Sequence, residues 1–335
     1  PKVTLQKPKI YKRNSSHKIH KIKVFLFINL SGGMVATLPR LCVLDVSCNA
    51  QLTQEVDTGG FRELVSSLSH ATSLTTLRLQ ACGLTPDSLD ALVQVLPSLT
   101  ALTELDVSSN KEVGGVVHLL VSALPVTQMR RLPFNSCYMS NKSFTALGNT
   151  HTHTHTHTHT HTHLFIYRSF PSTLAVSYLR TVDISWCKVV GGHLALLLDA
   201  LQPSVVSELR LCSCELTTDD MQHLAAVCRR GCLSSLRALD LSYNSLVGDN
   251  GWCSLFAAGG LGSLEDVDVS LRPSTSAPCS AWLPALLRAL PQMPALARLA
   301  MQRWTADCQE REQLRYCLKK RSVLLPPPVC ECESD

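Results

Sequence analysis

The stretch LRALDLSYNSL, residues 236–246, has leucines at its first, fourth, sixth and last positions and an asparagine at its ninth. Two apolar residues that flank one outward residue show the alternation of a β-strand. The same pattern recurs as LCVLDVSCNAQL (41–52), LTTLRLQACGL (74–84), LTELDVSSNKEV (102–113), MRRLPFNSCYM (129–139), LRTVDISWCKV (179–189) and VSELRLCSCEL (206–216), and in two incomplete copies, LEDVDVSLRPS (264–274) and LARLAMQRW (296–304). This recurrence predicts a repeat protein in which each copy stacks on the next.

The spacing of the copies is regular except at one place. Most copies begin about 28 residues after the previous one, whereas about 50 residues separate Met129 from Leu179. The outward residue of the strand alternates between acidic and non-acidic, and keeps this parity across the long interval: Asp45, Arg78, Asp106, Pro133, Asp183, Arg210 and Asp240. We therefore expect the interval to contain an insert of about 22 residues and no missing repeat.

The ninth position of each complete copy lies where the chain turns away from the strand. Its side chain must satisfy backbone groups that neighbouring turns bury. Asparagine supplies two donors and an acceptor, whereas cysteine is a weak donor that packs well. We call the occupants of this position the turn ladder: Asn49, Cys82, Asn110, Cys137, Cys187, Cys214 and Asn244.

A helix is expected between one strand and the next. Thr85-Pro86-Asp87 is a helix start, followed by Leu89, Leu92, Val93 and Leu96 on one face. Thr217-Thr218-Asp219 starts another, with Met221, Leu224, Ala225 and Cys228 pointing inward. Strand plus helix in every copy predicts an α/β solenoid, with parallel strands on its concave face and helices on its convex face.

These copies resemble the leucine-rich repeat, and their length resembles that of the ribonuclease-inhibitor-like subclass. The resemblance implies a horseshoe-shaped, non-enzymatic intracellular protein, and it supplies no catalytic or ligand motif to carry over. It also implies that the chain is a fragment lacking N-terminal repeats.

Composition divides the chain into segments. Residues 1–37 form a basic leader that we expect to be disordered or non-native, because residues 1–40 hold nine Lys and Arg and neither Asp nor Glu. The solenoid covers 38–304 and is interrupted at about 149–172 by a disordered insert. The insert contains alternating His and Thr from His151 to His163, as a translated CA dinucleotide repeat would, so we hypothesise that it derives from an intron. A capping helix within 305–325 and a tail at 326–335 complete the chain.

Motifs of catalysis and cofactor binding are missing from the sequence. It has no phosphate-binding G-x-x-x-x-G-K-[ST] motif, and its Cys212/Cys214 and Cys330/Cys332 pairs lack the spacing of a zinc site. We therefore expect no enzymatic activity, no cofactor and no metal. No apolar run reaches the length of a membrane span, and the chain after the leader is mildly acidic, which argues against membrane and nucleic-acid partners. Fifteen cysteines without a disulfide framework indicate reduced thiols and a cytoplasmic location.

The outward strand positions form the expected binding surface. Its column of first positions begins with Thr76 and Glu104, and a column at the turn contains Trp186, Tyr243 and Arg303. The candidate partner-binding residues on this face are Asp106, Arg131, Asp183, Trp186, Glu208, Arg210, Asp240 and Tyr243. Their mixed charges favour a protein partner over a polyanion or a small-molecule substrate.

Two questions about this surface stay open from the sequence. The aspartates and arginines of neighbouring strands could satisfy one another, and Trp186 and Tyr243 could stack on their neighbours without any role in binding. The leading hypothesis is a protein-interaction scaffold. The alternative is the ligand-sensing, C-terminal repeat region of a NACHT-type receptor.

Overall fold

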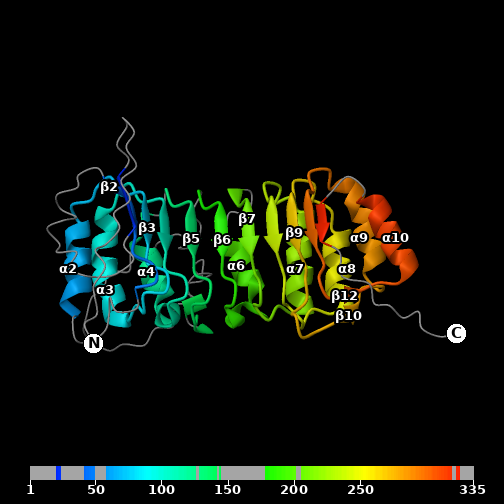
Figure 1. Cartoon of the computed structure of the whole chain (residues 1–335), viewed down its shortest axis with the longest axis horizontal. Helices are drawn as coiled ribbons and strands as arrows, with labels where there is room; N and C mark the ends of the chain where they lie inside the picture. The colour runs from blue at the N-terminus through cyan, green and yellow to red at the C-terminus, as the bar shows by residue number, and fades with distance from the viewer. Residues whose placement is uncertain are drawn as a thin grey trace, which may run out of the picture.

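The computed structural model describes residues 20–23, 41–49, 58–125, 128–141, 143–144, 178–200, 205–318 and 322–324. Parallel strands stand side by side along the molecule in the order in which they occur in the chain (Figure 1). The strands of this sheet are β1 (His20–Lys23), β2 (Leu41–Asp45), β3 (Thr76–Arg78), β4 (Glu104–Asp106), β5 (Arg131–Pro133), β6 (Thr181–Asp183), β7 (Glu208–Arg210), β8 (Ala238–Asp240), β9 (Asp266–Asp268), β11 (Arg298–Ala300) and β13 (Ser322–Leu324). All nine copies of the sequence pattern, the two incomplete ones included, form a strand where it was expected.

The register of the sheet aligns equivalent positions of neighbouring copies. Thr76 pairs with Glu104, and Glu104 pairs with Arg131, so the first outward residues form one continuous column. Arg131 in turn pairs with Thr181, which makes β5 and β6 direct neighbours across the long interval. No strand is therefore missing between them, as the alternation of the outward residues predicts. The His-Thr tract itself lies outside the described residues.

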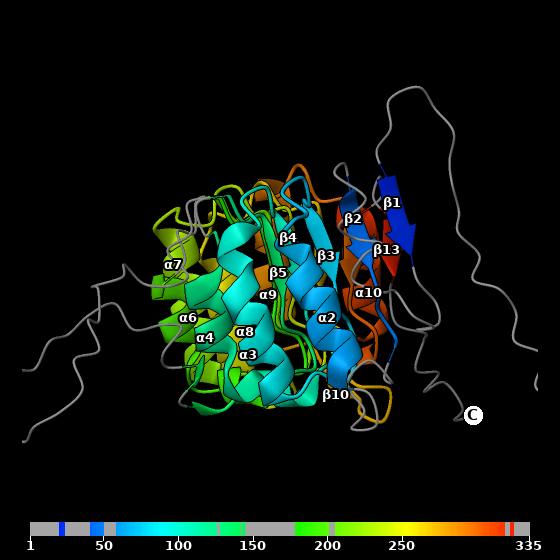
Figure 2. The ribbon, with the colours of Figure 1, turned by 90° about the vertical axis from the view of Figure 1, so that its left-hand side faces the viewer.

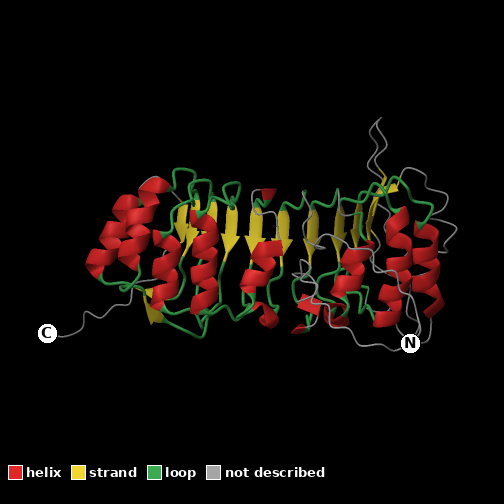
Figure 3. Cartoon of the chain, turned by 180° about the vertical axis from the view of Figure 1, so that it is seen from behind, coloured by secondary structure: helices red, strands yellow, loops and turns green. Residues whose placement is uncertain are grey.

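The described helices lie along one face of the sheet (Figures 2 and 3). They are α2 (Thr58–Leu68), α3 (Pro86–Val95), α4 (Val117–Ala123), α6 (Leu194–Ala200), α7 (Thr218–Arg229), α8 (Asp249–Ala257), α9 (Leu283–Ala289) and α10 (Cys308–Cys317). Short 3₁₀ turns occur at Leu96–Ser98, Lys111–Gly115, Lys188–Val190 and Leu290–Gln292. We call the opposite face of the sheet the strand face.

The two helix starts predicted from the sequence are confirmed. Thr85 caps α3 through the backbone N–H of Ser88, and Thr217 caps α7 in a capping box with Asp220. The inward residues of these helices are buried as expected, except for Val93, which is half-buried.

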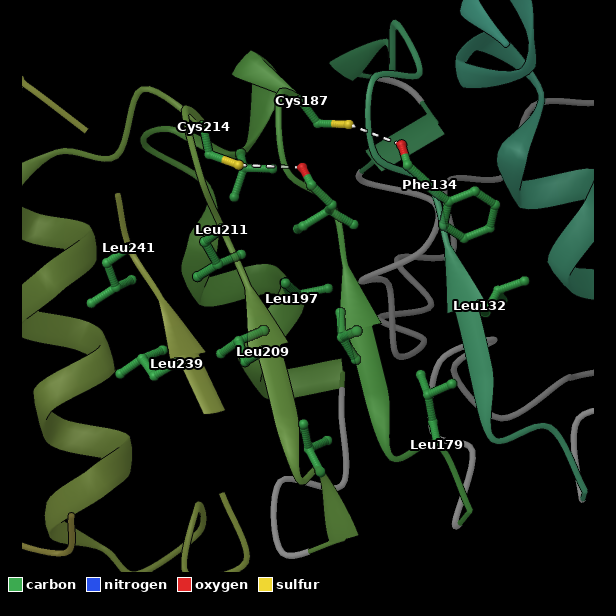
Figure 4. Close-up of a cluster of buried hydrophobic side chains, with 14 of the residues drawn as sticks. Leu132, Phe134, Leu179, Cys187, Leu197, Leu209, Leu211, Cys214, Leu239 and Leu241 are labelled. Carbon is green, nitrogen blue, oxygen red and sulfur yellow. Dashed lines mark hydrogen bonds between the residues drawn. The ribbon is translucent and has the colours of Figure 1, made fainter. Parts of the chain in front are cut away.

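The space between strands and helices is filled mainly by aliphatic side chains. Leu236, Leu239 and Leu241 are each at most 2% exposed, and the equivalent leucines of other copies form one continuous core (Figure 4). A cluster of aromatic side chains lies at the C-terminal end of this core, where the Trp282 ring lies 4.9 Å from that of Trp304 and 5.6 Å from that of Phe256. Beside it, β10 (Ala277–Pro278) pairs with β12 (Trp304–Thr305) in a separate small sheet.

Both ends of the sheet depart from the sequence expectation. The capping helix expected within 305–325 occupies only part of that range, since α10 ends at Cys317, whose thiol is exposed. The chain then adds β13, which pairs with β11. Residues 20–23 of the basic leader form β1, which pairs with β2. Neither end strand lies within a copy of the repeat pattern, so the pattern could not locate them.

Candidate functional site

Eight of the nine copies, all except the one at 264–274, turn away from their strand through a residue with left-handed backbone geometry. These residues, with φ between 51° and 69°, are Cys48, Ala81, Ser109, Ser136, Trp186, Ser213, Tyr243 and Arg303, each directly before the ninth position. Their N–H groups continue the hydrogen-bond pattern into the next repeat, as from Trp186 to the Cys212 carbonyl at 2.7 Å. Left-handed geometry is uncommon for residues other than glycine and asparagine, and it is most unusual for bulky side chains such as tryptophan. The solenoid therefore holds two aromatic residues in a strained conformation.

The turn ladder follows directly, and its side chains are buried. The Nδ2 group of Asn244 donates to the carbonyls of Leu211 and Leu241 at 2.8 and 2.9 Å, while its Oδ1 accepts the N–H groups of Cys214 and Leu216. Asn110 makes the equivalent set of bonds with the preceding repeat. Each of these asparagines thus joins two successive turns.

The ladder cysteines donate to the same backbone position with a thiol. Cys187 Sγ lies 3.4 Å from the Phe134 carbonyl oxygen, and Cys214 Sγ lies 3.2 Å from that of Ile184 (Figure 4). Cys82 and Cys137 bond to the preceding repeat in the same way. At the first ladder position, Asn49 donates to the Val46 carbonyl of its own repeat at 2.6 Å.

These thiols are kept protonated by their surroundings. Burial raises the pKa of Cys82 to about 11 and that of Cys187 to about 12, and it raises the pKa of Cys214 well above its ordinary value. A protonated thiol is the form that can donate to a carbonyl. The ladder cysteines therefore have a structural role and are poor nucleophiles.

Sequence reasoning missed one member of the turn ladder. Trp304 occupies the ninth position of the last incomplete copy, and its indole N–H donates to the Val269 carbonyl at 2.7 Å. Val269 is equivalent to Leu211, the residue whose carbonyl accepts from Asn244. Only its place in the 296–304 copy could have identified Trp304, because its residue type does not match the pattern.

The aspartates of the strand face have a local structural partner. Asp183 Oδ1 accepts the N–H of Ser185 at 3.1 Å, and Asp240 Oδ1 accepts both the N–H and the hydroxyl of Ser242, at 3.0 and 2.6 Å. The same Asp-x-Ser arrangement occurs at Asp45, Asp106 and Asp268. The aspartates therefore fix the end of the strand, which explains why they recur.

The arginines of this face form ion pairs with carboxylates at the first outward position. Arg78 and Arg131 share Glu104 Oε1, at 3.1 and 3.5 Å, and Arg210 pairs with Glu208. Arg298 binds Asp266 through two nitrogens. The possibility that the alternating arginines and aspartates satisfy one another does not describe these ion pairs, because the aspartates accept hydrogen bonds from serines and the arginines pair with first-position carboxylates.

The two aromatic candidates lie beside each other. The Trp186 and Tyr243 rings meet edge to face with their centroids 6.2 Å apart, although the repeat that contains Ser213 separates them in the chain. The small Ser213 side chain accepts a hydrogen bond from Arg272 Nη2 at 2.7 Å. Trp186 stays 50% exposed in this arrangement.

The eight candidate partner-binding residues fall into two groups. Asp106 and Arg131 border a depression of about 570 Å³ near the N-terminal end of the strand face, lined by Asp45, Ser47, Cys48, Arg78, Gln80, Glu104, Asp106 and Arg131. The other six lie at the centre of the strand face, on β6 to β8 and the turns that follow. Cys212 is only 8% exposed, and burial raises the pKa of its thiol to about 11.

Replacing Asp240 by asparagine is expected to increase the free energy of unfolding at pH 7. Burial is the main cause that raises the pKa of this carboxyl, against the opposing effect of the Ser242 hydrogen bonds, and Asp268 raises it further. A pKa that is higher in the folded chain means that ionisation destabilises the fold. This destabilisation is absent below the ordinary carboxyl pKa of about 3.9 and complete above the folded pKa.

The asparagine that replaces Asp240 can still accept the Ser242 N–H, so the variant removes charge and keeps the hydrogen bond. Urea unfolding of D240N and the wild type at pH 7 and pH 4 measures the effect. The stability gain should be present at pH 7 and shrink at pH 4. A variant less stable than the wild type at pH 7 would contradict the expectation.

The described part of the chain holds neither a metal-binding cluster nor a membrane-spanning helix. There, no three His, Cys, Asp or Glu side chains gather closely enough to hold a metal ion. Within the same ranges, no helix combines the length and the apolar character needed to cross a bilayer. The described cysteines are thiols, not disulfides.

A family model described as Leucine Rich repeat matches residues 232–252, which contain β8, Tyr243 and Asn244. The fold is an α/β leucine-rich repeat solenoid. Similar solved structures include an internalin (inlF) from Listeria monocytogenes, at 14% identity and a TM-score of 0.44 over 89% of this chain and 62% of that one. This chain thus spans less than two thirds of the internalin's length.

Two further similar structures come from other organisms. The leucine-rich repeat-containing protein LegL7 of Legionella pneumophila is 16% identical, with a TM-score of 0.45 over 91% of this chain and 81% of that one. The tropomodulin C-terminal domain of Caenorhabditis elegans is also 16% identical, with a TM-score of 0.36 over 42% of this chain and 83% of that one.

Proposed function

We propose that this chain is a non-enzymatic scaffold that binds a protein partner through its strand face. The observation that carries the proposal is the contact between Trp186 and Tyr243, two aromatic residues in left-handed geometry on the rim of that face. Exposed aromatic side chains often dominate the energy of protein interfaces.

The stacking of the two rings does not by itself account for their presence. Trp186 remains half exposed after the contact, so most of the apolar gain from burying it is not realised in the isolated chain. At the same turn position other repeats have serine, alanine, cysteine or arginine, so the fold itself does not demand an aromatic residue. A partner that covers the pair would provide the missing burial.

We extend the proposal to location and subclass. The protonated thiols of the turn ladder suit a reducing compartment, which supports a cytoplasmic location. The repeat length supports the ribonuclease-inhibitor-like subclass. Stretches such as LSYNS (241–245), GDNGW (248–252) and MQRW (301–304) resemble the vertebrate leucine-rich repeat-containing protein numbered thirty-one. On this proposal the chain needs no cofactor and takes neither a small-molecule substrate nor nucleic acid.

The test is capture of binding proteins from cell lysate by the immobilised chain, compared among three forms. We expect the double variant W186A/Y243A to capture at least about tenfold less of a protein that the wild type binds. Truncating a hot-spot residue typically removes about 2 kcal/mol or more of binding free energy. Y316A is the matched control, because Tyr316 is 79% exposed on α10, away from the strand face. Equal capture by all three forms would contradict the proposal.

A further inference from the structure

The strand face carries an excess of negative charge in the outward columns of its strands. Its two outward columns hold eight carboxylates and four arginines among the described residues: Asp45, Glu104, Asp106, Asp183, Glu208, Asp240, Asp266 and Asp268, with Arg78, Arg131, Arg210 and Arg298. All four arginines are engaged by Glu104, Glu208 or Asp266. The Asp-x-Ser aspartates are not the ion-pair partners of these arginines, although Arg210 stands opposite Asp183 and Asp240 in the sheet.

Two of these aspartates stand directly opposite each other. The alternation of acidic and non-acidic residues breaks after β8, so Asp240 pairs in register with Asp268 on β9. Like charges at opposed positions of neighbouring strands destabilise a sheet. Both residues are half-buried, which weakens the screening of this repulsion by solvent. A positive charge placed against the pair would relieve it.

The hydrogen bonds of these aspartates leave room for such a charge. In Asp183, Asp240 and Asp268 the serine N–H is accepted by Oδ1, so the bond to serine does not use Oδ2. Asp183 belongs to the same repeat as Trp186, and Asp240 to the same repeat as Tyr243. Carboxylates in the same repeats as the exposed Trp186 ring and the half-buried Tyr243 ring suit lysine and arginine side chains, because a ring face and a carboxylate both attract a cation.

We infer that the partner presents a basic segment, rich in lysine or arginine, to the surface formed by Asp183, Asp240, Asp268, Trp186 and Tyr243. This inference deepens the proposed function and rests on it, since it names the chemistry of the partner for the same face. The charge complementarity would steer the encounter, and the aromatic pair would supply the apolar contact.

The test uses a fluorescein-labelled peptide of six Arg-Ser repeats and a matched Glu-Ser peptide, with binding measured by fluorescence anisotropy. We expect the wild type to bind the basic peptide and not the acidic one. The basic peptide should bind at least about tenfold more weakly to D183N/D240N/D268N, in which asparagine can still accept the serine N–H. The control D90N/D219N/D249N removes the same number of charges from exposed positions of α3, α7 and α8 and should bind like the wild type.

Quenching of tryptophan fluorescence in the wild-type chain tests the same inference without relying on a variant that folds correctly. Trp252, Trp282 and Trp304 are at most 4% exposed, so Trp186 is the tryptophan that quenchers in solution reach. Caesium ions should quench its fluorescence more strongly than iodide does, relative to free tryptophan amide, and the basic peptide should protect it. W186F should lose both effects.

The two proposals fail in different ways. Stronger quenching by iodide, tighter binding of the acidic peptide, or equal binding of the basic peptide to both triple variants would overturn the basic partner. If W186A/Y243A still failed to capture the protein that the wild type binds, the scaffold proposal would stand without the basic partner. If capture were unaffected by W186A/Y243A, the scaffold proposal would fail at its own test.

Discussion

Replacing Asn244 by leucine is expected to lower the free energy of unfolding by about 4 kcal/mol. Leucine fills a similar volume but cannot replace the bonds that Asn244 makes. The N–H groups of Cys214 and Leu216 lose their acceptor, and the carbonyl of Leu211 loses its donor. These groups are buried, and each buried polar group left without a partner costs about 1–3 kcal/mol. Urea unfolding followed by circular dichroism measures the change.

The natural cysteine copies provide the matched comparison. N244C should lose about half as much stability as N244L, because a thiol can still donate to the preceding carbonyl, as Cys214 does to that of Ile184. C214A removes one weak sulfur hydrogen bond and a little packing, so it should lose about 1–2 kcal/mol. A loss below about 1 kcal/mol for N244L would contradict the role assigned to the turn ladder.

The strands could be predicted from the sequence because their pattern depends on local periodicity. Leucines at the first, fourth and sixth positions must face one core, and this fixes both the strand and its register with the next copy. The insert did not disturb this prediction, since the parity of Asp183 relative to Asp106 already placed β6 beside β5. The columns of outward residues then followed from the register.

The contacts that define the candidate site could not be predicted in the same way. Left-handed geometry is usually signalled by glycine or asparagine, but here Trp186, Ser213 and Tyr243 adopt it because the hydrogen bonds of the neighbouring repeats impose it. The contact between Trp186 and Tyr243 spans the intervening repeat, which has serine at the equivalent position. Such effects arise only when side chains of three repeats are placed together.

The pairing of charges shows the same limit. The alternating outward residues left open whether aspartates and arginines of neighbouring strands satisfy one another. In the structure each aspartate accepts a hydrogen bond from the serine two residues later, as Asp183 does from the Ser185 N–H. Arg210 forms its ion pair with Glu208. An N–H two residues away is always within reach of an aspartate, whereas a long arginine side chain can choose among several neighbours.

Of two adjacent glycines, Gly114 is expected to tolerate alanine poorly and Gly115 to tolerate it well. A Cβ atom on Gly114 would lie 2.1 Å from the carbonyl carbon of Tyr138 and 2.4 Å from the nitrogen of Met139. Both are backbone atoms of the next repeat, so no side chain can move aside to relieve the clash. G114A should therefore lose about 3 kcal/mol or more, because the two repeats must separate.

G115A is the internal control for this prediction. No atom lies within 4 Å of a Cβ placed on Gly115, so its variant should stay within about 0.5 kcal/mol of the wild type. The same close approach recurs at Gly191, where a Cβ would lie 2.0 Å from the carbonyl oxygen of Glu215, so G191A should behave like G114A. Thermal unfolding of the three variants decides the matter. Equal stability of G114A and G115A would mean that neighbouring repeats do not approach as closely as the shared hydrophobic core requires.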